Sequence, residues 1–284
     1  MRDAQPMAMN GKGLFGGIRI LKIGFICPTY NARALDSYTR VALESFYDTT
    51  PDGIAIVVDD ASSDWDRDYE DSLHRLAAGY DGQIHLIHYT KSGGLTRSWN
   101  AGLAKADQLG LDYAISGNND VVFTELWYQG MLQALDDGYA MAGPLSNAPG
   151  TTAEGKQEIE RYASNFRLTD ERSYLNQLAE ELRQQYPRQV IQSRVNGFFH
   201  MAAMDTWRKG KYSEPDLFYC PVNNFNWKGR RNRTPLMTLN EMELQIRWFE
   251  KGMKSAIALS SFIFHYRAVS RGERYRKENS FRKQ

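Results

Sequence analysis

The sequence predicts an α/β protein in which helices cover both faces of a mostly parallel sheet. Short apolar runs alternate with longer helical segments through the first half of the chain. This alternation is typical of parallel strands joined by crossover helices. Polar residues follow directly after several of the apolar runs, at the edge where such sheets bind their ligands. The two observations together predict the architecture and the place of a binding site.

The first half supplies five extended segments with four helices between them. The expected strands are short and apolar, and they are Lys22–Cys27, Ile54–Val58, Ile84–His88, Tyr113–Ser116 and Tyr139–Ala142. The longer segments between them are Ala32–Tyr47, Asp66–Ala78, Leu95–Leu109 and Leu126–Leu135, and their periodicity favours helix. Ser62-Ser63-Asp64 offers N-cap residues for the second helix.

The second half is less regular. After a turn-rich stretch, the expected elements are a helix over Gln157–Gln185, an apolar strand over Val195–Ala203, an aromatic-rich loop over Ser213–Asn232, a helix over Asn240–Lys251 and a strand over Ala256–Phe264. Gly252 is suited to a left-handed cap at the end of the last helix. The apolar stripe of that helix, expected to be core, is Met242, Ile246, Phe249 and Met253.

Length and composition indicate one globular domain. The chain has 284 residues, 42% of them apolar, and a formal net charge of +1, so no overall field favours nucleic acid. We expect a loose leader over residues 1–20, one domain over 21–270 with halves at 21–145 and 146–270, and a basic tail over 271–284. No apolar run reaches the ~18 residues of a membrane span.

The two cysteines, Cys27 and Cys220, match no metal-binding spacing and fit a reducing compartment. The leader lacks the apolar core of a signal peptide. We therefore expect a cytoplasmic protein, working at the inner face of the membrane if its acceptor is lipid-linked. The sequence carries no signal for an oligomeric state.

The strongest chemical signal is Asn118-Asn119-Asp120, which follows one expected strand. Divalent cations such as Mg²⁺ and Mn²⁺ prefer oxygen ligands, commonly one or two carboxylates together with substrate phosphates. An amide and a carboxylate at a strand end can supply such ligands. The alternative is a turn rich in asparagine, because Asn and Asp favour turns in any case.

Six motifs, in order along residues 22–270, resemble the family 2 inverting glycosyltransferases of the GT-A fold. They are Cys27-Pro28-Thr29-Tyr30-Asn31, Val57-Val58-Asp59-Asp60-Ala61-Ser62-Ser63-Asp64, Gly93-Gly94-Leu95-Thr96-Arg97-Ser98-Trp99-Asn100-Ala101-Gly102, Asn118-Asn119-Asp120-Val121, Asn196-Gly197-Phe198-Phe199 and Asn240-Glu241-Met242-Glu243-Leu244-Gln245-Ile246-Arg247. A late His265 matches the family as well. The resemblance implies a single Rossmann-like GT-A domain with a nucleotide-binding half and an acceptor-binding half.

The resemblance also implies a donor site. A carboxylate can accept a hydrogen bond from a uracil or thymine imide, and a tyrosine ring can stack on the base. The Arg of the glycine-rich motif suits phosphate contact. The residues expected to bind the nucleotide sugar are Pro28, Thr29, Tyr30, Asn31, Asp59, Asp60, Gly94, Arg97, Asn100, Asn118 and Asn119. For the Asp59-Asp60 pair the alternative is a solvated loop.

Asp120 and His265 are the metal ligands that the resemblance implies, for Mn²⁺ or Mg²⁺. Asn118 replaces the first aspartate of the family's Asp-x-Asp motif, which removes one negative charge from the site. This departure motivates an alternative, a non-catalytic GT-A protein that binds sugar or nucleotide with a decayed metal site. Arg267 and Arg271 of the C-terminal region could fold over the donor diphosphate, or they could belong to a solvated terminus.

Glu241 is the expected catalytic base, one methylene longer than the family's usual aspartate. Two capping boxes compete for the same helix start, Thr238 with Glu241 and Asn240 with Glu243. If Asn240 caps the helix, Glu241 is free to face the cleft and Glu243 reaches back toward Asn240. Glu243 is the second candidate for the base. We expect Arg247 to pair with Glu243 four residues earlier. The donor is expected to be a UDP- or dTDP-sugar, and the acceptor a glycan or lipid-linked hydroxyl.

Overall fold

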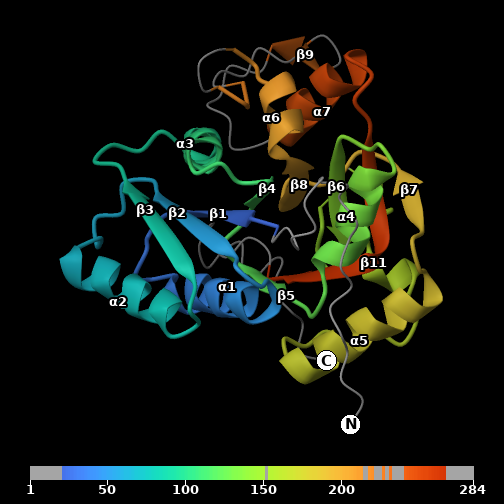
Figure 1. Ribbon diagram of the computed structural model, residues 1–284, viewed down its shortest axis with the longest axis horizontal. Coiled ribbons are helices and arrows are strands. Elements are labelled where there is room, and N and C mark those ends of the chain that lie inside the picture. Colours follow the sequence, from blue (N-terminus) through green and yellow to red (C-terminus); the bar gives the residue numbers. More distant parts are fainter. Residues whose placement is uncertain are drawn as a thin grey trace, which may run out of the picture.

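A computed structural model describes residues 21–150, 153–213, 217–220, 226–227, 230–231 and 240–266. The leader, the basic tail, Arg267, Arg271 and Thr238 lie outside these residues. The described residues form a nine-stranded sheet in the order β3-β2-β1-β4-β8-β6-β11-β5, with β7 beside β11, and a separate two-stranded pair, β9 with β10 (Figure 1).

The strands are β1 (Ile23–Thr29), β2 (Ile54–Asp59), β3 (Gln83–His88), β4 (Tyr113–Gly117), β5 (Val121–Phe123), β6 (Met141–Leu145), β7 (Val190–Gln192), β8 (Phe199–Ala203), β9 (Asn226–Trp227), β10 (Arg230–Arg231) and β11 (Ser255–His265). The helices are α1 (Asp36–Thr49), α2 (Arg67–Ala78), α3 (Leu95–Gln108), α4 (Tyr128–Asp136), the 3₁₀ turn η1 (Ile159–Arg161), α5 (Arg172–Gln185), α6 (Met204–Lys209) and α7 (Asn240–Glu250).

The sheet is mostly parallel, as the sequence predicts. β1, β2, β3 and β4 run parallel to one another, and β6 runs parallel to β11. β8 is antiparallel to both β4 and β6, and it therefore joins the two parallel groups into one sheet. β5 and β7 pair antiparallel with β11.

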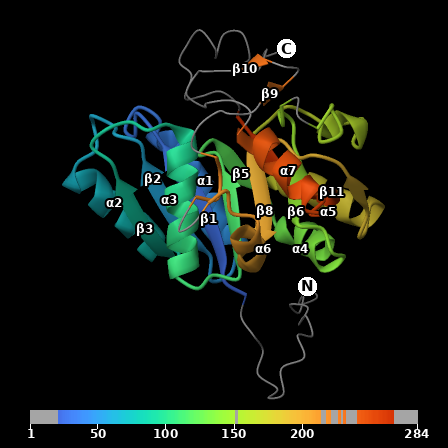
Figure 2. The ribbon, with the colours of Figure 1, turned by 90° about the horizontal axis from the view of Figure 1, so that it is seen from above.

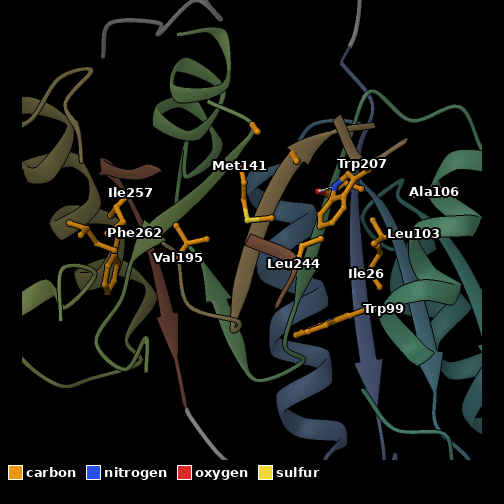
Figure 3. Close-up of a cluster of buried hydrophobic side chains, with 14 of the residues drawn as sticks. Ile26, Trp99, Leu103, Ala106, Met141, Val195, Trp207, Leu244, Ile257 and Phe262 are labelled. Carbon is orange, nitrogen blue, oxygen red and sulfur yellow. Dashed lines mark hydrogen bonds between the residues drawn. The ribbon is translucent and has the colours of Figure 1, made fainter. Parts of the chain in front are cut away.

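Helices cover both faces of the sheet. Figure 1 shows α3 on one side of β1–β3 and α1 and α2 on the other, and the turned view of Figure 2 shows α3 and α7 in front of the sheet. Buried side chains of α3, α5, α6 and α7 form one core layer, part of which Figure 3 shows around Trp99 and Trp207. Residues of α1, α2 and α4 form the second, around Phe46 and Trp127. No helix among the described residues has the length and apolar character to cross a bilayer.

Two expected elements are shorter than predicted. Gln157–Gln185 is not one helix, because turn-favouring residues such as Ser164-Asn165 and Thr169-Asp170 separate η1 from α5. The strand expected over Val195–Ala203 begins only at Phe199. The backbone N–H of Asn196 donates instead to the Gln157 side chain at 2.6 Å, so the chain bends there before it enters the sheet.

Helix α7 presents a different face to the core than predicted. Its buried residues are Asn240, Leu244, Gln245 and Trp248, whereas Phe249 of the expected stripe is 63% exposed. The predicted cap at Gly252 is confirmed, with φ +77°. The predicted cap of α2 was wrong: Asp66 caps this helix by accepting a hydrogen bond from the backbone N–H of Tyr69 at 2.8 Å.

Candidate active site

Polar residues from both halves of the chain meet at one edge of the sheet. β1, β2 and β4 end there because they are parallel, and β8 begins there because it is antiparallel to β4. β11 also ends there, since His265 pairs with Val121 at the start of β5. We call this edge the strand-end site; it comprises residues 28–31, 59–60, 94–100, 118–120, 147–148, 196–198, 240–241 and 265.

The end of β1 supplies an exposed aromatic ring and a buried hydroxyl. Pro28 and Thr29 lie within the strand, Tyr30 is 46% exposed, and Asn31 turns the chain with φ 55°. The Thr29 Oγ1 atom is buried and has no hydrogen-bond partner among the described residues. Because an unsatisfied buried hydroxyl is costly, this position suits a ligand that supplies the missing hydrogen bond.

Asp59 is turned into the protein at the end of β2. Its carboxylate is fully buried and accepts hydrogen bonds from the backbone N–H of Ser62 at 2.8 Å and from the Ser62 hydroxyl. It also lies 2.9 Å from Nδ1 of His88, whose ring stacks on Trp65. Asp59 thus fixes its own loop and the end of β3, and a direct contact with a nucleobase stays a prediction.

Asp60 holds the start of α3. Its carboxylate accepts hydrogen bonds from the Ser92 hydroxyl at 2.6 Å, from the backbone N–H groups of Gly93 and Gly94 at 2.8 Å each, and from the Arg97 guanidinium. Gly94 has φ 80°, a conformation that favours glycine. Burial acts to raise the pKa of Asp60, but the four hydrogen bonds outweigh it and hold the pKa below its ordinary value.

The Arg97 guanidinium lies over the Tyr89 ring, with its Cζ 3.8 Å from the ring centroid. One of its nitrogens also donates to the Lys91 carbonyl at 2.5 Å. Its Nε is buried without a hydrogen-bond partner among the described residues. Arg97 is therefore held in place by neighbouring groups, although its Nε lacks a hydrogen-bond partner among the described residues.

Two predicted nucleotide ligands have packing roles in the structure. The Asn100 amide accepts hydrogen bonds from the backbone N–H groups of Phe218 and Tyr219 and donates to the Tyr219 carbonyl. Asn119 donates to Thr39 Oγ1 on α1 at 3.1 Å. Phe218 and Tyr219 are fully buried, so this part of the aromatic loop packs into the core. A nucleotide contact by either asparagine stays a prediction.

Asp120 and His265 meet at the centre of the strand-end site. The Asp120 Oδ1 atom lies 3.2 Å from His265 Nε2, and both side chains are 6% exposed. The Asn118 amide also lies 3.2 Å from Nε2. The pairing of β5 with β11 brings these residues together although they are far apart in the sequence.

Residues that the sequence analysis missed hold His265 in place. The Asn147 amide accepts from the His265 N–H at 2.9 Å and donates to the His265 carbonyl at 3.1 Å. The His265 Nδ1 lies 2.8 Å from the Ala148 carbonyl, and the ring stacks on Phe198 at 5.1 Å. The signal for Asn147 was present, because it is a polar residue close after a strand, but the stretch from Pro144 to Gly155 was predicted to be a turn.

The donor set at Asp120 and His265 fits a divalent cation that also binds a phosphate ligand. A carbonyl only accepts hydrogen bonds, so the contact with Ala148 places a proton on Nδ1 of His265 and, in the neutral ring, a lone pair on Nε2. Nε2 and the carboxylate oxygen then face the same point. Within the described chain no group of three or more His, Cys, Asp or Glu side chains could hold a metal ion. Two protein ligands suffice where substrate phosphates complete the coordination.

Glu241 lies across the site at the start of α7. Its carboxylate packs so closely on Gly197 that an added Cβ there would lie 2.8 Å from Glu241 Cδ. Gly197 precedes Phe198, whose carbonyl accepts from the Asn118 N–H at 2.9 Å and whose ring stacks on His265. A close approach that only glycine permits thus brings the carboxylate to the segment that supports the Asp120–His265 pair.

The start of α7 distinguishes the two glutamates. Glu243 does not reach back to cap the helix as the capping box with Asn240 predicts; it pairs with Arg247 at 2.8 Å, which confirms the predicted pair. Asn240 donates to Thr96 Oγ1 at 3.3 Å and accepts from the Glu241 N–H. Glu243 is therefore engaged in an ion pair, and Glu241 is the carboxylate next to Gly197.

The sequence profile of glycosyl transferase family 2 matches residues 25–205. The match extends over more than half of the chain. The protein belongs to glycosyl transferase family 2. No curated protein sequence matches the chain.

The fold of the chain is similar to that of the solved structure of GalNAc-T7. The structure of GalNAc-T7 with UDP, GalNAc and Mn²⁺ aligns with a TM-score of 0.58 at 13% identity, over 87% of this chain and 44% of that chain. Residues 1–349 of S. aureus TarS in complex with UDP align with a TM-score of 0.37 at 17% identity, over 47% of this chain and 40% of that chain. This chain therefore covers less than half of either protein. The similarity to GalNAc-T7 supports the GT-A fold predicted from the sequence.

Proposed function

We propose that this protein is a metal-dependent inverting glycosyltransferase that moves a sugar from a UDP- or dTDP-linked donor to a hydroxyl of a glycan or lipid-linked acceptor. One observation carries the proposal: the His265 ring, paired with Asp120, stacks on Phe198, and the Glu241 carboxylate packs on the preceding residue, Gly197. A group that can hold a diphosphate-bound cation and a group that can accept a proton thus contact adjacent residues of one short segment.

The ends of β1 and β2 and the start of α3 form the nucleotide side. Tyr30 offers an exposed ring for stacking on a base. Thr29 Oγ1 and Arg97 Nε are buried polar atoms that a bound nucleotide could satisfy. The UDP in the structure of GalNAc-T7 supports the assignment of a nucleoside diphosphate to such a fold.

The Asp120 carboxylate and the His265 imidazole would hold Mn²⁺ or Mg²⁺, with Asn118 beside them. When bound, the cation neutralises the negative charge that the diphosphate gains as it leaves. Asn118 carries no charge, and this lowers the negative charge of the site relative to two aspartates. The Mn²⁺ in the structure of GalNAc-T7 supports this choice of metal.

Glu241 acts on the acceptor. The acceptor oxygen forms a bond with the anomeric carbon while the bond from that carbon to the diphosphate oxygen breaks. The acceptor proton passes to the Glu241 carboxylate, and the nucleoside diphosphate leaves with the bonding electrons. Because the attack comes from the face opposite the leaving group, the configuration of the anomeric carbon inverts. A positioned base of this kind contributes typically ~10²–10⁴-fold to the rate.

A donor screen tests the proposal. UDP- and dTDP-sugars are incubated with glycan and lipid-linked acceptors, nucleotide release is measured with and without EDTA, and NMR determines the anomeric configuration of the product. We expect release with one class of donor, an inverted product, and loss of activity in EDTA that added Mn²⁺ restores. No turnover, together with UDP binding that Mn²⁺ does not change in calorimetry, would support the non-catalytic alternative instead.

A further inference from the structure

Asn147 joins the backbone of His265 by two hydrogen bonds of its side chain. The amide oxygen accepts from the His265 N–H at 2.9 Å, and the amide nitrogen donates to the His265 carbonyl at 3.1 Å. Asn147 lies just beyond β6, whose last residue, Leu145, pairs with Phe262 of β11. Past this point the backbone of Ser146 forms hydrogen bonds with the backbone of Gln157 and Ile159 instead of β11. The Asn147 side chain makes the hydrogen bonds to the His265 backbone that the backbone of a neighbouring strand would otherwise make.

Ala148, the next residue, determines which nitrogen of His265 carries the proton. Its carbonyl lies 2.8 Å from Nδ1, and a carbonyl can only accept, so the proton lies on Nδ1. In the neutral ring the opposite nitrogen, Nε2, then has the lone pair, and it lies 3.2 Å from Asp120 Oδ1. The two residues thus act on His265 in different ways: one fixes its backbone, and the other fixes its tautomer.

We infer that the Asn147-Ala148 segment positions His265 as a metal ligand, with Asn147 a positioning residue that acts through His265. The inference rests on the proposed metal site. Groups that orient a ligating histidine through its second nitrogen or its backbone typically change metal affinity 10–100-fold when they are removed. The Phe198 ring stacks on one face of the His265 imidazole and so restricts the orientation of the imidazole as well.

The test measures Mn²⁺ binding by electron paramagnetic resonance titration at saturating UDP, for the wild type and Asn147→Ala. We expect ~10–100-fold weaker Mn²⁺ binding, with the metal-independent affinity for UDP unchanged. Asn176→Ala is the matched control, because its amide also makes a two-way bridge, to the Glu125 N–H at 2.9 Å and the Glu125 carboxylate at 3.2 Å. That variant should bind Mn²⁺ as the wild type does.

Nitrogen-15 shifts of the His265 ring give a second readout without metal. The wild type should show the proton on Nδ1. Asn147→Ala should show a mixture of the two tautomers, because loss of both backbone bonds lets the ring move away from the Ala148 carbonyl that fixes the proton on Nδ1. If Asn147→Ala does not fold, Asn147→Ser, which keeps a small polar side chain, is measured in its place. Wild-type Mn²⁺ affinity in the folded variant would overturn the inference. Wild-type Mn²⁺ affinity in His265→Ala and Asp120→Ala would instead overturn the metal assignment of the proposed function.

Discussion

Two aspartate–histidine pairs stand at the same edge of the sheet, and they differ in which histidine nitrogen faces the carboxylate. Asp59 lies 2.9 Å from Nδ1 of His88, whereas Asp120 lies 3.2 Å from Nε2 of His265. Asp59 also accepts two hydrogen bonds from Ser62. In the second pair Nδ1 already donates to the Ala148 carbonyl, so a lone pair of neutral His265 points toward the carboxylate.

The difference teaches that a short Asp–His distance alone does not identify a metal site. In the first pair, protons lie between the groups and the contacts connect β2, its loop and β3. In the second, the Nε2 lone pair and a carboxylate oxygen lie close together beside the Asn118 amide nitrogen, and a cation would stabilise the two electron-pair donors. Burial of the carboxylates does not separate the pairs, since Asp59 is 0% and Asp120 4% exposed. What marks the second pair is the Ala148 carbonyl, which lies 2.8 Å from the His265 nitrogen remote from the carboxylate.

The largest effect should come from removing the carboxylate of the second pair. We expect Asp120→Ala to abolish Mn²⁺- or Mg²⁺-dependent turnover, because it removes the only charged ligand proposed here for the cation. The measurement is nucleotide release over a range of Mn²⁺ concentrations, with a thermal melt to check the fold. Asn118→Ala should reduce turnover less, since a neutral amide contributes at most a weak ligand. Full activity of Asp120→Ala, or of the wild type in excess EDTA, would contradict the proposal that the Asp120–His265 pair holds a metal ion and the Asp59–His88 pair does not.

Glu241→Gln tests whether the reaction takes place beside the second pair. The substitution keeps the shape of the side chain and removes its basicity, so turnover should fall by ~10²–10⁴ while UDP affinity stays near that of the wild type. Steady-state rates and calorimetry measure the two quantities. Glu243→Gln is the matched control two residues away; it loses the ion pair with Arg247 and should keep most of the rate. A rate loss in Glu243→Gln alone would move the base, and a rate loss with a large fall in melting temperature would indicate damage to the helix.

Asp59→Ala should affect stability more than chemistry. Without the carboxylate, the buried N–H of Ser62 has lost its acceptor, and an unsatisfied group of this kind costs about 1–3 kcal/mol. Urea unfolding of the variant should show that decrease in the free energy of unfolding, while the Mn²⁺ dependence of turnover stays as in the wild type. A loss of UDP affinity at unchanged stability would instead indicate a direct contact between Asp59 and the nucleotide.

The first half of the fold could be predicted because its signals are local. Each strand is followed within a few residues by its helix, and the polar residues come directly after the strands. β5 and β7 depend on pairing with β11, which is distant in the sequence, and a three-residue run such as Val121–Phe123 has no periodicity to show it. The face of α7 depends on which elements cover it, and for this reason Phe249 is exposed although its spacing fits a core stripe.

The site could be located from the sequence, but the partners of its residues could not. Asp59 and Asp60 are adjacent, yet one bonds to Ser62 and His88 and the other to the start of α3. Asn100 binds the backbone of Tyr219, which lies 119 residues further along the chain. Such contacts arise only when the chain has folded, so a motif gives the place of a residue and not the direction of its side chain.

The smallest effect concerns Asp60, the neighbour of the first pair, whose backbone N–H donates to the Thr29 carbonyl. Hydrogen bonds from Ser92, Gly93, Gly94 and Arg97 outweigh its burial and lower its pKa in the folded state. A group with a lowered folded pKa stabilises the protein above its unfolded pKa, about 3.9, and this contribution is lost as the pH falls through the folded pKa.

Asp60→Asn should therefore destabilise the protein at about pH 6, and the difference from the wild type should shrink as the pH falls below about 3.9 and through the lowered folded pKa of Asp60. Urea unfolding at a series of pH values from about 6 downward through this range measures the difference. Asp64→Asn, in the same loop but outside this network, is the control. A difference between wild type and Asp60→Asn that does not change with pH would mean that the charge of Asp60 does not stabilise the start of α3. In that case the contacts with Ser62 and His88 would fix Asp59 without a contribution from the charge of Asp60.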